Sequence, residues 1–268
     1  MINGDTPAIS HALGFRGHSA RFACRFCKID GLGIKSMAII EEPKVGERRK
    51  KPKVTYYPIL KTPPDTPARF RQRVFDHRLG VDHVIRTPQD LDSYENAIRT
   101  MNKDDLEEYS QNCGVSRSTC LWKLQTIRQS FPFCAPEESM HTIFLNLIPQ
   151  LVDLTCGLYF DNVRIFPISV YNKMGKALVA NQKYFPVEFG ERIPNIVDER
   201  RQFQASTWNA YALMIMPISF LHNLPVTHQA PWSRFFWTIQ TIHAHIVERE
   251  HIELIDLYMI DFVHYLEG

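Results

Sequence analysis

Two cysteines near the start of the chain have the type and spacing that bind a metal ion. Cys24 and Cys27 occur in CRFCKIDG, and a CxxC turn can present two thiolates to one zinc ion. A structural zinc site is almost always tetrahedral, so two further ligands must come from elsewhere. His18, six residues before Cys24, is a candidate for one of them. Two alternatives stay open for the cysteines: buried inert thiols and a redox-active pair.

An aspartate immediately precedes the first predicted helix. In GDTPAISHALGF, Thr6 and Pro7 are typical of an N-cap and a first helical position, and Gly14 is typical of a helix end. Asp5 is therefore either an ordinary turn acid or a carboxylate placed for chemistry. The other histidines of the chain, 11 in all with His18, are more typical of surface or core positions than of ligands.

The composition is that of a soluble globular protein and gives no global sign of a polyanionic partner. The 268 residues are 44% hydrophobic and 22% charged, with a net charge of +2. Six cysteines without a leading apolar segment predict a reducing compartment, either cytoplasmic or nuclear. The longest apolar stretch, YALMIMPISFL, is too short to span a bilayer and contains Pro217. We therefore expect no membrane partner.

A basic, proline-rich stretch follows the cysteines. Residues 31–87 include KVGERRKKPK and KTPPDTPARF, which predict a loop or insertion with little regular structure. Clustered basic side chains neutralise DNA phosphates, which makes this stretch a candidate for weak contact with the DNA backbone. The alternative is a solvated basic linker. The candidate residues are Arg48, Arg49, Lys50, Lys51 and Lys53.

From about residue 88 onward the hydrophobic spacing is helical. TPQDLDSYENAIRTMN starts with a capping signal and spaces Leu91, Tyr94, Ile98 and Met101 three or four residues apart. Further helices are predicted from about residue 206, over 232–248 and over 251–266. We expect a core fragment with the CxxC motif over 1–30, an insertion over 31–87 and a helical domain over 88–268.

One predicted helix, over about 138–156, is strongly apolar. Pro149 should kink it and Gly157 should end it. Its large apolar residues cover more than one face, so the helix is expected to be largely buried. These residues are Phe144, Leu145, Leu147, Ile148, Leu151 and Leu154.

Three blocks of sequence carry a resemblance to a known family. The first, GDTPAISHALGFRGHSARFACRFC, has an acid before Pro-Ala, then Gly-Phe, Gly-His-Ser and CxxC. The second, SFPFCAPEESMHTIFLNLIPQL, has an acid two positions before Met-His and an apolar helix after it. The third, FGERIPNIVDERRQFQASTWNAYALMIMPISFL, has Phe-Gly, Pro-x-Ile, Trp and Pro in order, and TYYP at 55–58 also fits. Together they resemble the CACTA-type (En/Spm-like) DNA transposases of fungi and plants.

The resemblance implies an α-rich mixed α/β fold: a ribonuclease H-like core with a zinc-binding helical insertion. In such a core three carboxylates hold two magnesium or manganese ions for phosphoryl transfer on DNA. Asp5 matches the second carboxylate, and Glu138 is a weaker catalytic candidate. Cys24 and Cys27 match half of the structural zinc site, with His18 and His141 as weaker ligand candidates. The remaining zinc ligands are expected far downstream.

The match is incomplete, which shapes the expected function. In the family, the first catalytic aspartate comes before the position matched by Met1, and the final glutamate comes after the last matched position, so neither is expected in this chain. Glu138 stands where aspartate is more usual. Ser206 and Thr207 stand where the family often has an acid before its tryptophan. We expect a transposase fragment that is inactive alone, with DNA or a full-length transposase as partner. The alternative is a helical, zinc-containing interaction module without catalysis.

Overall fold

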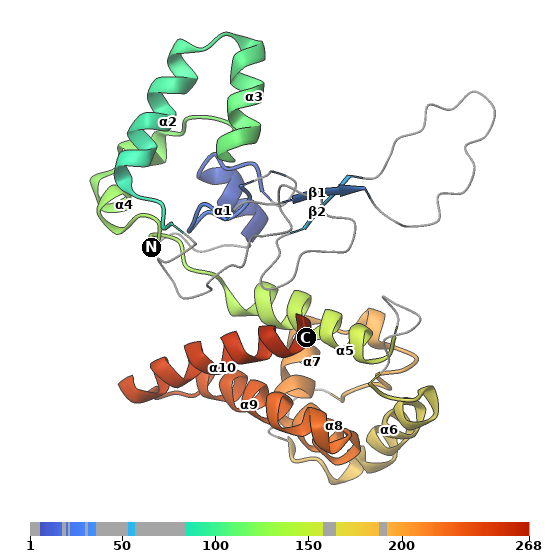
Figure 1. The fold of residues 1–268 in the computed structure, drawn as a ribbon. Coiled ribbons are helices and arrows are strands. Elements are labelled where there is room, and N and C mark those ends of the chain that lie inside the picture. Colours follow the sequence, from blue (N-terminus) through green and yellow to red (C-terminus); the bar gives the residue numbers. More distant parts are fainter. Residues whose placement is uncertain are drawn as a thin grey trace, which may run out of the picture. The chain divides into compact units, whose positions relative to one another are not determined.

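The computed structural model describes residues 6–17, 20, 22–29, 32–35, 53–56, 84–157, 165–187 and 192–267 (Figure 1). The described part is α-rich, as expected, and its only sheet is one pair of strands. The chain divides into two compact units at Glu137 and Glu138. This boundary falls inside the stretch 88–268, which we had expected to form one helical domain.

The described residues of the first unit form four α-helices and one antiparallel pair of strands. Strands β1 and β2 pair antiparallel, with Gly33 opposite Thr55, inside the stretch that was expected to be a loop or insertion with little regular structure. A short 3-10 helix, Cys120–Lys123, precedes α4. The elements are α1 (Thr6–Ala12), β1 (Leu32–Lys35), β2 (Lys53–Tyr56), α2 (Pro88–Thr100), α3 (Lys103–Cys113) and α4 (Gln125–Ser130).

Capping residues explain where α2 and α3 begin. Thr87 and Asp90 form a capping box at α2, and the backbone N–H of Thr87 donates to Asp90 Oδ2 at 2.8 Å. The side chain of Asn102 accepts from two backbone N–H groups at the start of α3. The buried face of α2 carries Leu91 and Tyr94, as the spacing predicted, but Met101 follows the helix as its C-cap and is 36% exposed.

The core of the first unit joins the segment before the cysteines to α2 and α4. Trp122 is buried, and its indole N–H donates to the carbonyl of Leu13 at 2.9 Å. Gly14 ends α1 with a positive φ of 80°, as its position predicted. The buried apolar residues are Ile9, Leu13, Phe15, Leu91, Tyr94, Val115, Trp122, Ile127, Phe131, Cys134 and Ala135.

The regular elements among the described residues of the second unit are all helices. Its core is rich in aromatic rings, with Trp232 packed against Phe236 and Phe262 at centroid distances of 5.6 and 5.2 Å. The α-helices are α5 (Ile148–Thr155), α6 (Ile168–Asn181), α7 (Ala205–Ala210), α8 (Met216–Asn223), α9 (Val226–Ile242) and α10 (Arg249–Glu267). Short 3-10 turns span Gln182–Tyr184 and Arg200–Gln202.

Two helical stretches of this unit contain a π-helical segment just before a proline. Met140–Leu147 precedes α5 and Pro149, and Tyr211–Ile215 precedes α8 and Pro217. The predicted helix over 138–156 thus exists as a π segment followed by an α-helix, and Gly157 follows it with a φ of 73°. Its burial is less complete than expected: Phe144, Ile148 and Leu151 are buried, whereas Leu145 is 36% exposed and projects away from the core.

A side chain of α9 contacts the second of these segments. Gln240 Nε2 donates to the carbonyl oxygen of Leu213, in the π-helical segment before Pro217, at 2.8 Å.

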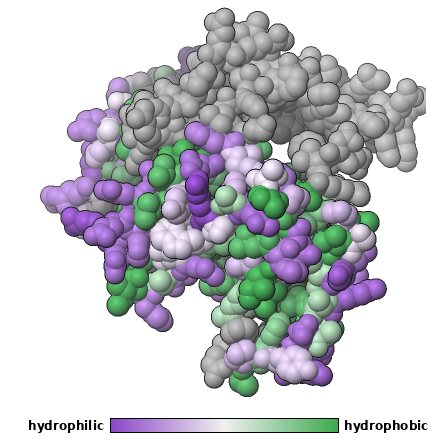
Figure 2. Space-filling view, turned by 60° about the horizontal axis from the view of Figure 1, so that its bottom comes forward, coloured by the Kyte–Doolittle hydropathy of each residue, from purple (hydrophilic) through white to green (hydrophobic). Residues whose placement is uncertain are grey.

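The surface shown in Figure 2 intersperses hydrophobic and hydrophilic residues. Among the described residues, no helix is long and apolar enough to cross a membrane.

Candidate functional site

The segment Cys24–Cys27 folds into a tight turn around one sulfur atom. The backbone N–H groups of Phe26 and Cys27 both donate to Sγ of Cys24, each with an N to S distance of 3.4 Å. Both cysteines are free thiols and half-buried. Two N–H donors directed at one sulfur stabilise its anionic form, which is the form that binds metal.

Residues 84–86 pair with the backbone on both sides of this turn. Cys27 forms an isolated antiparallel bridge with Ile85. The N–H of Lys28 donates to the carbonyl of Val84, and the N–H of Arg86 donates to that of Phe26, both at 2.9 Å. Residues about 60 positions later in the chain therefore fix the backbone of the turn.

The two thiols are predicted to differ in protonation. A hydrogen bond from the Cys27 thiol lowers the pKa of Cys24 to about 6; burial opposes this shift, and the N–H donors and the charge of Arg86 add to it. The same hydrogen bond, together with burial, raises the pKa of Cys27. These opposite shifts, together with the two N–H donors, favour Cys24 over Cys27 as the thiolate of the pair.

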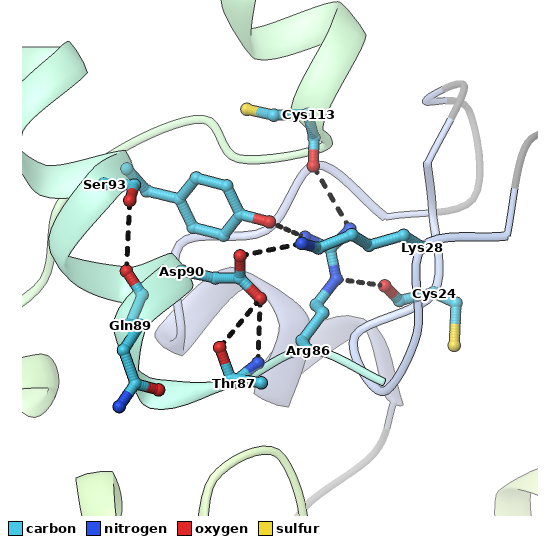
Figure 3. A network of polar contacts seen from close by, with 9 residues as sticks. Cys24, Lys28, Arg86, Thr87, Gln89, Asp90, Ser93 and Cys113 are labelled. Carbon is cyan, nitrogen blue, oxygen red and sulfur yellow. Dashed lines mark hydrogen bonds and ion pairs between the residues drawn. The ribbon is translucent and has the colours of Figure 1, made fainter. Parts of the chain in front are cut away.

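The buried side chain of Arg86 lies at the centre of the polar network in Figure 3, with 1% exposure. Its Nε donates to the carbonyl of Cys24 at 3.0 Å, and Nη2 donates to the carbonyl of Cys113 at 3.1 Å. Its Nη1 donates to the hydroxyl of Tyr94. The turn is therefore tied to α2 and to the end of α3 through one guanidinium group.

An ion pair makes a second link between the turn and α2. Lys28 Nζ lies 2.7 Å from Asp90 Oδ1, and the other oxygen of Asp90 completes the capping box (Figure 3). Burial would raise the pKa of Asp90, but the hydrogen bonds from Lys28 and Thr87 and the charge of Lys28 outweigh it and lower the pKa. Asp90 thus serves both the helix start and the cysteine turn.

Arg25, inside the turn, connects it to the end of the first unit. Its side chain is 3% exposed, donates to the carbonyl of Ala135 at 3.1 Å and lies 3.0 Å from the carboxylate of Glu137. Phe26 stacks on Phe133 with a centroid distance of 5.8 Å. The four residues of CRFC are therefore packed on several sides.

The arrangement fits half of a zinc site. Two cysteine sulfurs suit zinc, and N–H donors to a sulfur are the outer contacts expected around a metal-bound thiolate. The described part of the chain contains no group of three or more His, Cys, Asp or Glu that could hold a metal ion. His18 lies outside the described residues. His141 belongs to the second unit, whereas the two cysteines belong to the first.

Of the two catalytic candidates, Asp5 and Glu138, the structure describes only Glu138. Asp5 lies outside the described residues. Glu138 binds its own helix start: Oε1 accepts from the N–H of Met140 at 2.6 Å, and Oε2 lies 2.6 Å from His141 Nδ1. Burial alone would raise the pKa of Glu138, but the backbone N–H groups and His141 outweigh it and lower the pKa. Both of its oxygens thus take part in a local cap.

The basic candidates can be placed only in part. Arg48, Arg49, Lys50 and Lys51 lie outside the described residues, and Lys53 begins β2. The other cysteines have ordinary environments: Cys134 and Cys156 are buried, and Cys120 is exposed.

Arg86, Lys28 and Asp90 were not recognised from the sequence as parts of the site. Asp90 was visible only as a capping residue, and nothing near Arg86 in sequence indicates that it binds a turn 62 residues earlier. No family model, no curated protein and no solved structure matches the chain. The geometry of the cysteine turn is therefore the main support for a function.

Proposed function

We propose that the chain is part of a CACTA-type DNA transposase, in which Cys24 and Cys27 supply half of a structural zinc site. The observation that carries the proposal is the turn itself. It occurs in the first sequence block of the resemblance, and its two N–H···S bonds arrange Cys24 as a thiolate ligand. The finer fold, a ribonuclease H-like core with a helical insertion, and a nuclear or cytoplasmic location belong to the same proposal.

Bound zinc would cross-link the turn to ligands outside the described residues and so contribute to folding. The chain's own part is to keep the two sulfurs close and half-buried, which limits access of water. Lys28, Arg86 and the bridge to Ile85 do this by fixing the backbone on both sides.

For catalysis, the proposal assigns Asp5 as a carboxylate that binds magnesium or manganese. Two-metal phosphoryl transfer needs several carboxylates around ions about 3.5–4 Å apart. Glu138 is a poor second ligand, because both of its oxygens are occupied at the start of its helix. The 268-residue chain is therefore expected to bind DNA weakly without cutting it.

Zinc content tests the metal part of the proposal. Elemental analysis of the purified wild type should find zinc, and a double variant with Cys24→Ser and Cys27→Ser should lose it. The single variant Cys120→Ser is the matched control, because this thiol is exposed and distant in sequence from the turn. Equal zinc in the wild type and the double variant would remove these cysteines as ligands.

Measurements of DNA binding and DNA cleavage test the other two parts of the proposal, weak contact with DNA and the absence of catalysis. Fluorescence anisotropy should show sequence-independent binding that weakens steeply with salt, with a slope of about 0.9 per neutralised phosphate. Neutralising Arg48, Arg49, Lys50, Lys51 and Lys53 should flatten that slope. Neutralising five exposed lysines elsewhere, Lys103, Lys123, Lys173, Lys176 and Lys183, should change it less. Plasmid nicking with magnesium or manganese, abolished by Asp5→Asn, would show that the chain is catalytically competent.

A second candidate function is a helical, zinc-containing module that binds DNA or a full-length transposase without catalysis. Both oxygens of the Glu138 carboxylate accept contacts at the start of their own helix. This favours a module without catalysis over a part that binds catalytic metal ions. Absence of nicking by the chain alone, together with formation of a complex with a full-length transposase in gel filtration, would support this module over a catalytic part.

A further inference from the structure

Arg86 makes an unusual set of contacts for a buried cation. Its side chain donates to three backbone carbonyls, those of Cys24 at 3.0 Å, Phe22 at 3.3 Å and Cys113 at 3.1 Å, and to the hydroxyl of Tyr94. All four acceptors are neutral. Within the described residues, no carboxylate forms an ion pair with Arg86, although seven other Arg or Lys side chains do so.

A buried charge is costly unless its position serves several hydrogen bonds at once. Arg86 holds the cysteine turn by two independent routes. Its backbone N–H donates to the carbonyl of Phe26 at 2.9 Å, while its side-chain Nε donates to that of Cys24. The carbonyls on both sides of Arg25 are therefore fixed by one residue.

The guanidinium group is itself held in place. Its central carbon lies 5.1 Å from the ring centroid of Phe15 and 5.6 Å from that of Tyr94, at distances where cation–π attraction operates. Phe15, Tyr94 and the end of α3 belong to the unit's own core and helices. The position of Arg86 thus depends on the fold of the unit and not on a metal.

We propose that Arg86 is a positioning residue that holds the Cys24–Cys27 turn in its metal-binding conformation before any metal arrives. The inference rests on the proposed zinc role of the two cysteines. It adds that the half-site is preorganised by the protein and does not form only around the ion. Loss of the Arg86 side chain should weaken metal binding while both thiols remain.

Lysine should not replace arginine here. The planar guanidinium donates in three directions in a fixed geometry, whereas the lysine ammonium is a compact charge on a flexible stem. Arg86→Lys keeps the charge and the backbone N–H to Phe26 but cannot reach the carbonyls of Cys24 and Cys113 together with Tyr94. Loss of an outer-shell contact typically reduces metal affinity about 10- to 100-fold.

Metal titration of the full chain tests the proposal. Cobalt binding is followed by thiolate-to-metal absorption, and zinc affinity by competition with a chromophoric chelator, with circular dichroism as a check of folding. Arg86→Lys should bind zinc about 10- to 100-fold more weakly than the wild type. Arg99→Lys, an exposed arginine of α2 that pairs with Glu95, is the control and should keep wild-type affinity. Wild-type affinity in a folded Arg86→Lys protein would overturn the proposal.

A measurement on the wild type covers the case in which Arg86→Lys does not fold. In metal-free protein, kept so by a chelator, hydrogen exchange should show protected N–H groups at Phe26, Cys27 and Lys28. Unprotected exchange there, with protection appearing only on zinc addition, would overturn the preorganised half-site and leave the zinc site intact. If the wild type binds no zinc through Cys24 and Cys27, both the proposed function and this inference fail.

Discussion

The carboxylate of Glu138 and the imidazole of His141 lie 2.6 Å apart, one turn apart at the start of a helical segment. The same carboxylate accepts from the backbone N–H groups of Met140 and His141, at 2.6 and 3.0 Å. Two residues that the sequence marked as catalytic or metal-binding candidates are therefore partners of each other. The Glu138 carboxylate satisfies free N–H groups of a helix start, and the His141 imidazole contacts that carboxylate.

This relationship predicts how Glu138→Gln behaves. The variant should lower the melting temperature of the second unit at neutral pH, because an anionic cap that accepts two N–H bonds is weakened. The pKa of Glu138 is lowered by folding, so its stabilisation is present above the unfolded-state value of about 4.3 and is lost as pH falls through the folded value. Thermal unfolding at pH 7 and at pH 3 should show a smaller difference between variant and wild type at pH 3 than at pH 7.

The same measurement with magnesium separates capping from catalysis. Any effect of magnesium on the melting temperature should be the same in the wild type and in Glu138→Gln. A magnesium-dependent increase in the wild type that Glu138→Gln abolishes would instead show that this carboxylate binds the ion.

The thiol of Cys24 should react at unusually low pH. Its pKa of about 6 makes it a thiolate above that pH, and the thiolate is the nucleophile. Alkylation of the metal-free protein by iodoacetamide, located by peptide mass spectrometry, should reach half its maximal rate near pH 6 at Cys24. The exposed Cys120 provides the internal comparison. The Cys27→Ala variant, which lacks the hydrogen bond to Cys24, should shift that midpoint upward, and an unchanged midpoint would contradict the assigned cause.

Gly114→Ala should destabilise the first unit and disturb the cysteine turn. Gly114 has a φ of 78°, and an added Cβ would lie 2.0 Å from the carbonyl oxygen of Phe22. That oxygen also accepts from Arg86, so the clash displaces a partner of the site. We expect a loss of more than about 1 kcal/mol in the free energy of unfolding, measured in urea. Gly17→Ala, where φ is also positive but nothing lies within 4 Å, controls for the backbone effect.

Gly175→Ala should destabilise the protein, although alanine is usually preferred over glycine inside a helix. In an exposed helix interior, alanine is favoured over glycine by about 1 kcal/mol. In α6, however, the added Cβ would lie 2.3 Å from Asn195 Oδ1 and 2.7 Å from Val197 Cγ2. The variant should therefore unfold at a lower temperature than the wild type. A higher melting temperature would show that the segment around Asn195 moves aside at little cost.

The sequence was sufficient where short-range signals decide the structure. Thr87 and Asp90 start α2, and Gly14 and Gly157 follow the ends of helical segments, as predicted. It was insufficient where distant residues meet. Nothing local marks Arg86 as a partner of Cys24, and nothing local shows that the chain divides at Glu137. Such contacts depend on the packing of whole helices, which a periodic pattern does not specify.

The bond between Gln240 and Leu213 shows how an irregularity in one helix can specify the position of another. Helices that meet only through apolar side chains can shift lengthwise by one turn and still bury similar surfaces. The carbonyl of Leu213, in the π-helical segment before Pro217, is a directional acceptor at a single height along its helix. Gln240 reaches it in one register of α9, and a shifted register would break this bond. The bond thus contributes to the uniqueness of the packed arrangement, in addition to the burial of apolar side chains.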